Sequence, residues 1–341
     1  MRTGLLAAAL FAHGAAVLAQ VPSSTGYHTA YETVLGGEGG WDYLTLDANG
    51  VRLYIARSTH VSVVDPESRK EVGTIPDTPG VHGIALAPEL GKGYTSNGRD
   101  ATVTVFDLRT LRQLSRISVG ANPDAIVYEP VTRSVFTFNG GSHDTSVIDA
   151  TKGVLAHTLP LGGKPEFAVA DGRGHVFVNV EDTSELIEID AAGPRVAARW
   201  PLAPCKEPTG LAMDVVRGHL FVGCSNRLMA IVDAGRGDVL ATLPIGAGCD
   251  ATAFDPKGGL AFAANGDGSL TIVREDSPGK FVVAENVKTR AGARTMALDS
   301  QRQRIYLVTA EYGPKPPATN DKPNPRPPIV PGSFTMLTLS R

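Results

Sequence analysis

Seven residues with polar or charged side chains occupy the same position in seven copies of a short phrase. The copies read WDYLTLD, VHGIALA, PDAIVYE, PEFAVAD, PTGLAMD, CDATAFD and ARTMALD. The second residue of each copy, which we call the head residue, is in turn Asp42, His82, Asp124, Glu166, Thr209, Asp250 and Arg294. If these side chains share a small space, their like charges raise some of the carboxylate pKa values, and together they can bind a polar ligand.

The spacing of the head residues predicts the elements that bring them together. Successive head residues are 40, 42, 42, 43, 41 and 44 positions apart, a period typical of propeller blades. In the fifth copy, turn residues separate four strand-like runs, which read GLAMD, HLFVGC, RLMAIVDA and DVLATLPIG. The chain lacks the long amphipathic helical patterns that a TIM barrel or a doubly wound sheet needs. We therefore predict an all-β seven-bladed β-propeller with four-stranded blades, whose head residues surround one mouth of the channel.

The two ends of the chain predict how the ring closes. After SFTMLTLSR, at residues 333–341, the chain stops and leaves the seventh unit one strand short. Residues 27–36, reading YHTAYETVLG, resemble the fourth strands of other units and have no first three strands of their own. We expect this N-terminal strand to complete blade seven, so that no open sheet edge remains at the junction.

Aspartates that end several first strands are predicted to be turn residues rather than catalytic acids. An aspartate at such a position accepts hydrogen bonds from nearby backbone N–H groups. The residues in question are Asp47, Asp171, Asp214, Asp255 and Asp299.

Composition and the N-terminal segment indicate where the protein acts. Residues 1–19 combine Arg2, an apolar run and a small-residue cleavage signal, which predicts a signal peptide; the run is too short for a membrane anchor. Residues 26–341 then form a single propeller domain in a periplasmic or secreted protein with no integral membrane segment, which we expect to be a monomer. The formal charge is −3 and no run of Lys and Arg occurs, which argues against a nucleic-acid partner.

The three cysteines are of interest in an exported protein, which meets an oxidising compartment. If the first two strands of blade five pair around a turn near Val216, Cys224 lies opposite Pro208, and Cys205 lies in the loop just before it. A Cys205–Cys224 disulfide is then geometrically reasonable, and the alternative is that both are reduced core residues. Cys249 is left as the odd thiol, for which we expect a packing role.

Several phrases resemble the halves of a known repeat. TVTVFDLRT, VSVVDPES and TSVIDATKG are similar to the "TVSVID" half of the YVTN repeat, and YTSNG, FTFNG and FAANG are similar to its "YVTNxG" half. The chain thus resembles the YVTN-repeat β-propellers of the YncE-like group over residues 26–341. The resemblance implies an exported seven-bladed propeller of mostly unassigned activity. The chain departs from the repeat at YIARSTH, FVNVEDT and FVGCSN, where a binding surface could have formed.

A metal site is a further possibility at the predicted mouth. His60, His82 and His143 come from three adjacent blades, and with Asp42 and Asp124 nearby they could bind zinc or copper. No closely spaced pair such as H-x-H or C-x-x-C supports this hypothesis. We therefore expect no cofactor, with a divalent metal as the alternative.

Residues 310–332 form a proline-rich insertion between the second and third strands of blade seven. The segment reads AEYGPKPPATNDKPNPRPPIVPG and has no apolar periodicity, so we expect an irregular or polyproline-like loop. Strand direction places it on the face of the head residues. There it is either a lid that carries Glu311, Tyr312, Lys315 and Arg326, or an excursion without a function.

The predicted mouth is compatible with two classes of function. The first is a binding or scaffold module for a small polar ligand or a cell-envelope protein. The second is a lactonase- or lyase-type enzyme, in which Asp124 or Glu166 acts as a base while Arg294, Lys164 or His82 stabilises an anionic intermediate. A purely structural alternative is a ring of side chains that binds only water and makes hydrogen bonds between blades. We favour binding, and the sequence leaves open whether any reaction is catalysed.

Overall fold

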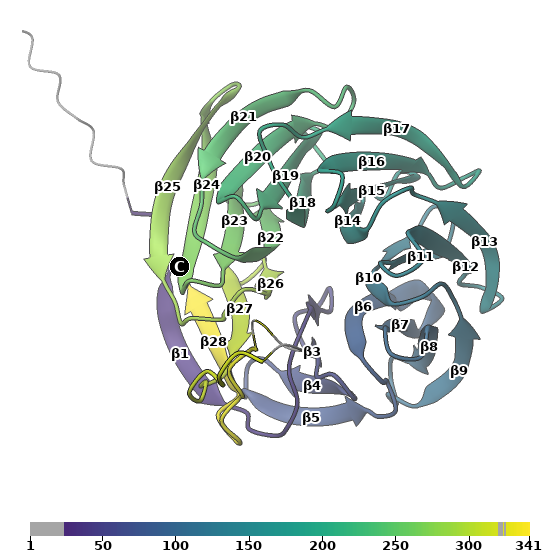
Figure 1. The fold of residues 1–341 in the computed structure, drawn as a ribbon, viewed down its shortest axis with the longest axis horizontal. Helices are drawn as coiled ribbons and strands as arrows, with labels where there is room; N and C mark the ends of the chain where they lie inside the picture. The colour runs from purple at the N-terminus through teal and green to yellow at the C-terminus, as the bar shows by residue number, and fades with distance from the viewer. Residues whose placement is uncertain (1–23, 320–322, 324) are drawn as a thin grey trace, which may run out of the picture.

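The computed structural model describes residues 24–319, 323 and 325–341. Its 28 strands form seven four-stranded antiparallel sheets arranged in a ring around a central channel (Figure 1). A 3-10 helix of three residues, Pro88–Leu90, is the only helix in this part of the chain. The structure confirms the predicted all-β seven-bladed propeller with four-stranded blades.

Each blade takes its strands in chain order from the channel outward, except blade seven. Blades one to three comprise β2 (Leu44–Leu46), β3 (Leu53–Ala56), β4 (Val61–Asp65) and β5 (Lys70–Ile75); β6 (Val81–Ala87), β7 (Lys92–Asn97), β8 (Thr102–Asp107) and β9 (Gln113–Ser118); β10 (Pro123–Glu129), β11 (Ser134–Asn139), β12 (Asp144–Asp149) and β13 (Val154–Pro160). Blades four to six comprise β14 (Pro165–Ala170), β15 (His175–Val180), β16 (Glu185–Asp190) and β17 (Arg195–Pro201); β18 (Pro208–Asp214), β19 (His219–Cys224), β20 (Leu228–Asp233) and β21 (Val239–Pro244); β22 (Cys249–Asp255), β23 (Leu260–Asn265), β24 (Ser269–Ser277) and β25 (Lys280–Lys288).

Blade seven is built from both ends of the chain. It comprises β26 (Met296–Asp299), β27 (Arg304–Thr309), β28 (Thr335–Ser340) and, outermost, β1 (His28–Val34). β1 pairs antiparallel with β28 from His28 opposite Ser340 to Val34 opposite Thr335. The predicted closure by the N-terminal strand is confirmed, and Figure 1 shows β1 along the outer edge of β28.

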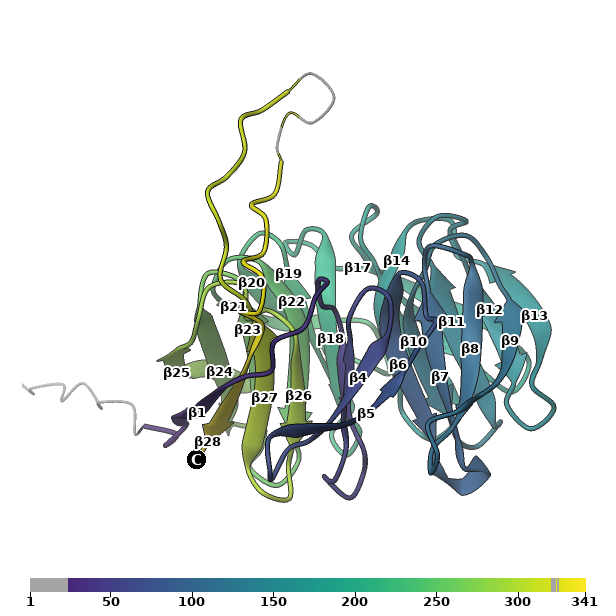
Figure 2. The same cartoon turned by 90° about the horizontal axis from the view of Figure 1, so that it is seen from below.

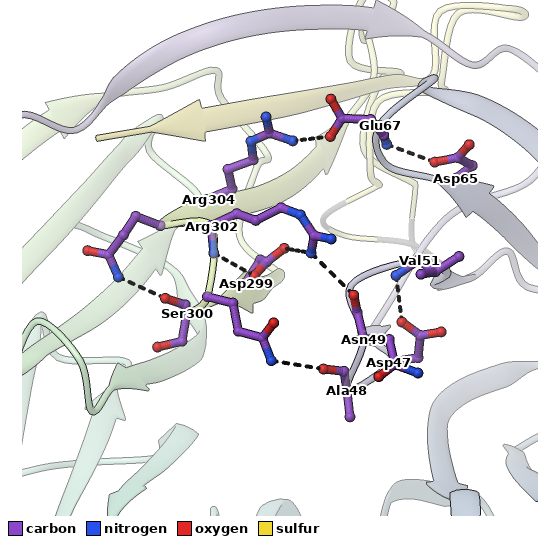
Figure 3. A network of polar contacts seen from close by, with 12 residues as sticks. Asp47, Ala48, Asn49, Val51, Asp65, Glu67, Asp299, Ser300, Arg302 and Arg304 are labelled. Atoms are coloured by element: carbon purple, nitrogen blue, oxygen red, sulfur yellow. Dashed lines mark hydrogen bonds and ion pairs between the residues drawn. The ribbon is translucent and has the colours of Figure 1, made fainter.

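Polar contacts reinforce the junction between blades seven and one (Figure 3). Arg302 is paired with Asp299 at 2.9 Å and donates a hydrogen bond of 3.3 Å to the backbone carbonyl of Asn49. Arg304 is paired with Glu67 at 2.7 Å. These contacts join turns of the last blade to turns of the first, which ties the two ends of the blade array together.

The aspartates that end the first strands serve as turn residues, as predicted. Each accepts at least one backbone hydrogen bond from the turn that follows it. These residues are Asp47, Asp171, Asp214, Asp255 and Asp299.

Apolar packing between neighbouring sheets holds the first strands in place. The second strands are almost fully buried, as in β11, whereas fourth strands such as β13 are largely exposed. Neighbouring first strands approach so closely that only small residues fit at some positions. A Cβ on Gly83 would lie 2.8 Å from the Ile126 side chain, and one on Gly210 would lie 2.8 Å from the backbone nitrogen of Thr252. Such tight packing fixes the strands that carry the head residues.

The cysteines pair as the sequence predicts. Cys205 and Cys224 form a disulfide with a Cα–Cα distance of 5.6 Å, which favours an oxidising compartment. Cys249 is a buried free thiol, and burial raises its pKa, so it has the packing role expected of it rather than a reactive one.

The signal peptide predicted for residues 1–19 lies outside the described residues. Among the residues that the structure does describe, no helix is long and apolar enough to cross a membrane.

The proline-rich insertion joins β27 to β28 on the face where the head residues lie. An isolated bridge pairs Tyr312 with Ile329, and the rings of Tyr312 and Trp41 are 6.2 Å apart, so the base of the insertion packs beside the mouth. Figure 2 shows the described part of the insertion standing up from the disc. The described part of the insertion therefore borders the mouth and does not lie flat across it.

Candidate functional site

The head residues lie where the chain enters the first strand of each blade. In blades two to six the head residue is the second residue of that strand, and Asp42 and Arg294 come two residues before β2 and β26. In those five blades the pairing of the first strand with the second shifts register across the head residue, for example between Pro123 and Ile126 around Asp124. Bulges of this kind re-aim a side chain, and they are common beside functional sites.

Asp42, His82 and Asp124 form one charged cluster at the mouth. The Nδ1 atom of His82 lies 2.6 Å from Oδ2 of Asp42 and 3.8 Å from Oδ1 of Asp124. Burial opposes the charged form of His82, but the hydrogen bond to Asp42 and the charge of Asp124 outweigh it and raise its pKa to about 9. At neutral pH His82 is thus a cation between two carboxyl groups. A Cβ on Gly98 would lie 2.8 Å from Nε2 of His82, so glycine at this position leaves room for the ring.

Two further pairs of opposite charge complete the ring of side chains. Lys164 contacts both Glu166, at 3.2 Å, and Glu181, while Nε of Arg294 lies 2.8 Å from Oδ2 of Asp250. Burial, and after it the charge of other carboxylates, raises the pKa of Glu166 to about 8. Burial also raises the pKa of Asp250, although the charge of Arg294 opposes that shift.

Asp124 is another carboxyl group whose ionisation is affected by burial and by its charged neighbours. Its side chain is 15% exposed. Burial raises its pKa to about 7; the nearby charge of His82 lowers it and that of Asp42 raises it further. Asp124 therefore exchanges its proton in the neutral range, where a group can act as a general acid or base.

An aromatic pair spans the channel next to the head residues. Tyr43 of blade one and Phe167 of blade four meet across the channel with ring centroids 4.9 Å apart. Burial and the charges of Asp124 and Glu166, among other carboxylates, raise the pKa of Tyr43 well above its usual value, so its hydroxyl stays protonated. The pair and the first strands of blades one to four line a hollow of about 370 Å³.

The mouth also contains a hollow of about 490 Å³, which we call the cup. A volume of this size is typical of sites for small molecules. The side chains that give the cup its chemical character are Trp41, Asp42, His82, Arg99, Arg294 and Arg326. The cup combines charges of both signs with one large aromatic wall, and it opens on the face that carries the proline-rich insertion.

Thr209 differs from the other six head residues. Its buried hydroxyl donates a hydrogen bond of 2.6 Å to the backbone carbonyl of Cys249 in the next blade. The side chain thus ties blade five to blade six.

The structure brings together only part of the predicted set of metal ligands. Within the described residues, Asp42, His82 and Asp124 offer ligand atoms that all lie within 4.8 Å of one another. One imidazole and two carboxylates suit a divalent ion such as zinc, provided that His82 gives up its proton. This grouping contains neither His60, which lies beside Thr59, nor His143, which is exposed in a turn at φ 58°.

Sequence reasoning missed the aromatic pair that spans the channel. Its signal is the residue that follows each head residue: this is glycine, alanine or threonine in five blades but Tyr43 and Phe167 in blades one and four. Two large residues at equivalent positions of opposite blades are able to meet at the axis. Glu181, which lies at the end of the second strand of blade four and is paired with Lys164, was also missed.

Comparison with solved structures supports the fold. The structure of U3-55K matches with a TM-score of 0.73 at 11% sequence identity, covering 92% of this chain and 99% of that one. The WD40 repeats of RRP9 match with a TM-score of 0.73 at 9% identity, covering 92% and 98% of the two chains. Kuenenia stuttgartiensis hydrazine synthase matches with a TM-score of 0.51 at 18% identity, covering 73% and 98%. At these identities the likeness concerns the propeller fold alone. No protein-family model and no curated protein matches the chain.

Proposed function

We propose that the protein is an exported binding propeller that holds a small polar molecule in the cup at its channel mouth. The observation that carries this proposal is a hollow of about 490 Å³ at the channel mouth, lined by charged side chains and one large aromatic side chain. Its size favours a small molecule over a cell-envelope protein as the occupant.

The energetics of the mouth argue against a purely structural ring. Asp124 and Glu166 have raised pKa values because burial and neighbouring carboxylates disfavour their ionised forms. Gathering these groups therefore costs folding stability at neutral pH. Groups that cost stability in this way tend to cluster at functional sites. A ring that served only to join blades would be more stable with neutral partners.

The proposed location follows from several features together. An apolar leader at residues 1–19, the Cys205–Cys224 disulfide and the resemblance to YVTN-repeat propellers of the YncE-like group all favour export. We assign the protein to the periplasm or the extracellular space on this basis. Detection of a mature N-terminus near Gln20 in secreted or periplasmic fractions would support the assignment, and a full-length cytoplasmic chain would contradict it.

A ligand screen with matched variants tests the binding proposal. Saturation-transfer NMR with sugars, sugar acids, amino acids and polyols would identify binders of the wild-type protein. Asp42→Asn alters the cup, whereas Asp276→Asn changes an exposed carboxylate outside it. We expect the affinity of a binder to change at least about tenfold with the first variant, which alters the charge of the cup, and not to change with the second. A panel without binders, or binders indifferent to Asp42→Asn, would contradict the proposal.

A lactonase- or lyase-type enzyme is the second candidate. It is favoured by two carboxyl groups, Asp124 and Glu166, whose pKa values of about 7 and 8 suit proton transfer near neutrality. Lys164 and Arg294 lie at the same mouth and could stabilise an anionic intermediate. Turnover of a lactone or uronide that is abolished by Asp124→Asn and by Arg294→Ala, with folding retained, would establish this function. Lack of turnover across both panels would leave binding alone.

A further inference from the structure

We infer that the ligand of the cup carries an oxyanion group, a carboxylate or a phosphate, bound by Arg99, Arg294 and Arg326. This inference rests on the proposed function and names its ligand class. Three guanidinium groups from separate segments line one hollow: Arg99 follows β7, Arg294 precedes β26, and Arg326 belongs to the proline-rich insertion. Planar guanidinium groups match the paired oxygens of carboxylates and phosphates.

The charge balance of the cup favours an anion. Asp42 is the only carboxylate among the described residues that line it, and this carboxylate accepts the hydrogen bond from His82. Arg294 is ion-paired with Asp250 through its Nε atom, and its guanidinium carries further N–H donors that a ligand can use. No carboxylate is paired with Arg99 or Arg326 in the described part of the chain. The cup thus holds more positive than negative charge, although the opposite side of the mouth is acidic.

The acidic groups of blade four lie apart from the arginines of the cup. The carboxylates of Glu166 and Glu181 lie with Lys164 on blade four, and none of the three lines the cup. The cup lies over blades seven, one, two and three, where the arginines and His82 are found. An oxyanion can therefore bind the arginine side and avoid direct contact with the carboxylates of blade four.

Other groups in the cup suit the uncharged part of such a ligand. Asn122 offers a side-chain amide, Ser58 offers a hydroxyl, and Trp41 provides an aromatic wall. Amides and hydroxyls bind the hydroxyl groups of a ligand, and an aromatic face packs against the C–H groups of a sugar ring. A hydroxylated acid, such as a sugar acid or a sugar phosphate, matches this combination.

Four probes with one shared sugar ring test the inference by isothermal titration calorimetry: glucuronate, glucose 6-phosphate, glucose and glucosamine. We expect at least one of the two anions to bind at least about tenfold more tightly than glucose, and glucosamine to bind no better than glucose. Whether glucuronate or glucose 6-phosphate binds more tightly distinguishes a carboxylate from a phosphate ligand. Raising the salt concentration should weaken the anion binding, because Arg99 and Arg326 are exposed.

Variants assign the preference to the arginines. The double variant Arg99→Gln, Arg326→Gln should lose at least about tenfold in affinity for the anion and leave glucose unaffected. Arg109→Gln, Arg173→Gln removes two exposed arginines that do not line the cup and is the matched control. Circular dichroism would verify that each variant is folded.

The outcomes separate the inference from the proposed function. Glucose or glucosamine that binds as well as both anions, and depends on Asp42, would overturn the inference and leave the proposed function standing. Anion binding that survives the Arg99→Gln, Arg326→Gln double variant would also overturn it. If none of the four probes binds, the inference fails, and the wider screen decides the proposed function.

Discussion

Replacing Asp124 with asparagine should stabilise the protein, and more so as the pH rises. Asparagine has the shape of a protonated aspartate and cannot ionise. In the folded protein burial raises the pKa of Asp124 to about 7 from an ordinary value of 3.8. The folded state therefore holds this proton more tightly than the unfolded chain does. The sign follows: stability is greatest below about pH 3.8 and is lost as the pH rises towards about 7.

The magnitude follows from these two pKa values. Relative to a permanently protonated group, the ionisable Asp124 costs about 2 kcal/mol at pH 5 and about 4 kcal/mol at pH 8, since one pKa unit corresponds to about 1.4 kcal/mol. The stability advantage of Asp124→Asn over the wild type should thus grow by roughly 2 kcal/mol between these pH values. Comparing the stability advantage at the two pH values cancels any effect of the amide that does not depend on pH.

Urea denaturation of both proteins at pH 5 and pH 8 measures this change. Asp107→Asn is the control, because hydrogen bonds from Thr110 lower the pKa of Asp107. Asp107 is ionised in both the folded and the unfolded protein throughout this range, so the effect of Asp107→Asn on stability should be the same at both pH values. An advantage of Asp124→Asn that does not grow with pH would refute the reasoning that buried carboxyl groups are crowded at the mouth.

Three further predictions concern groups around the mouth and the disulfide. His82→Gln should lower the free energy of unfolding by about 2 kcal/mol near pH 6, because the charge-assisted hydrogen bond to Asp42 is lost. Since the pKa of His82 is raised to about 9, this loss should shrink as the pH rises through that value. Urea titrations that show the same loss at every pH would contradict the pairing. Cys224→Ser should lower the unfolding free energy by about 3 kcal/mol, because the disulfide closes a loop across 19 positions; equal stability of variant and wild type under oxidising conditions would contradict it. Arg57→Lys should lower the free energy of unfolding by about 2 kcal/mol and speed amide hydrogen exchange in residues 36–40, because the buried guanidinium donates hydrogen bonds to carbonyls of this loop. Unchanged exchange in residues 36–40 would contradict a role of Arg57 in ordering the loop.

The fold was readable from the sequence because three independent patterns agree. A period in the low forties gives the number of blades, alternation within each unit gives the strands, and a unit one strand short requires a donor strand elsewhere. Residues 27–36 were the only unassigned strand-like run, and β1 is that strand. Repeats make such inference strong, because an error in one copy is corrected by the other six.

Only the general location of the candidate site could be predicted from the sequence. Equivalent positions in the blades place the head residues at one mouth, but the direction of each side chain depends on the local bulge and on its neighbours. Thr209 donates a hydrogen bond to the backbone of the next blade, a contact that the spacing of the repeats does not predict. His60 and His143 are on loops, and their distance from the axis depends on loop conformation. Pairings such as that of Lys164 with Glu181 depend likewise on three-dimensional contacts.

The central claim, that the cup is a ligand site, is tested most directly by a high-resolution crystal structure of the protein with the tightest binder from the screen. We predict ligand density inside the cup, in contact with Trp41, His82 and Arg294. Density at another surface, with only water in the cup, would contradict the claim.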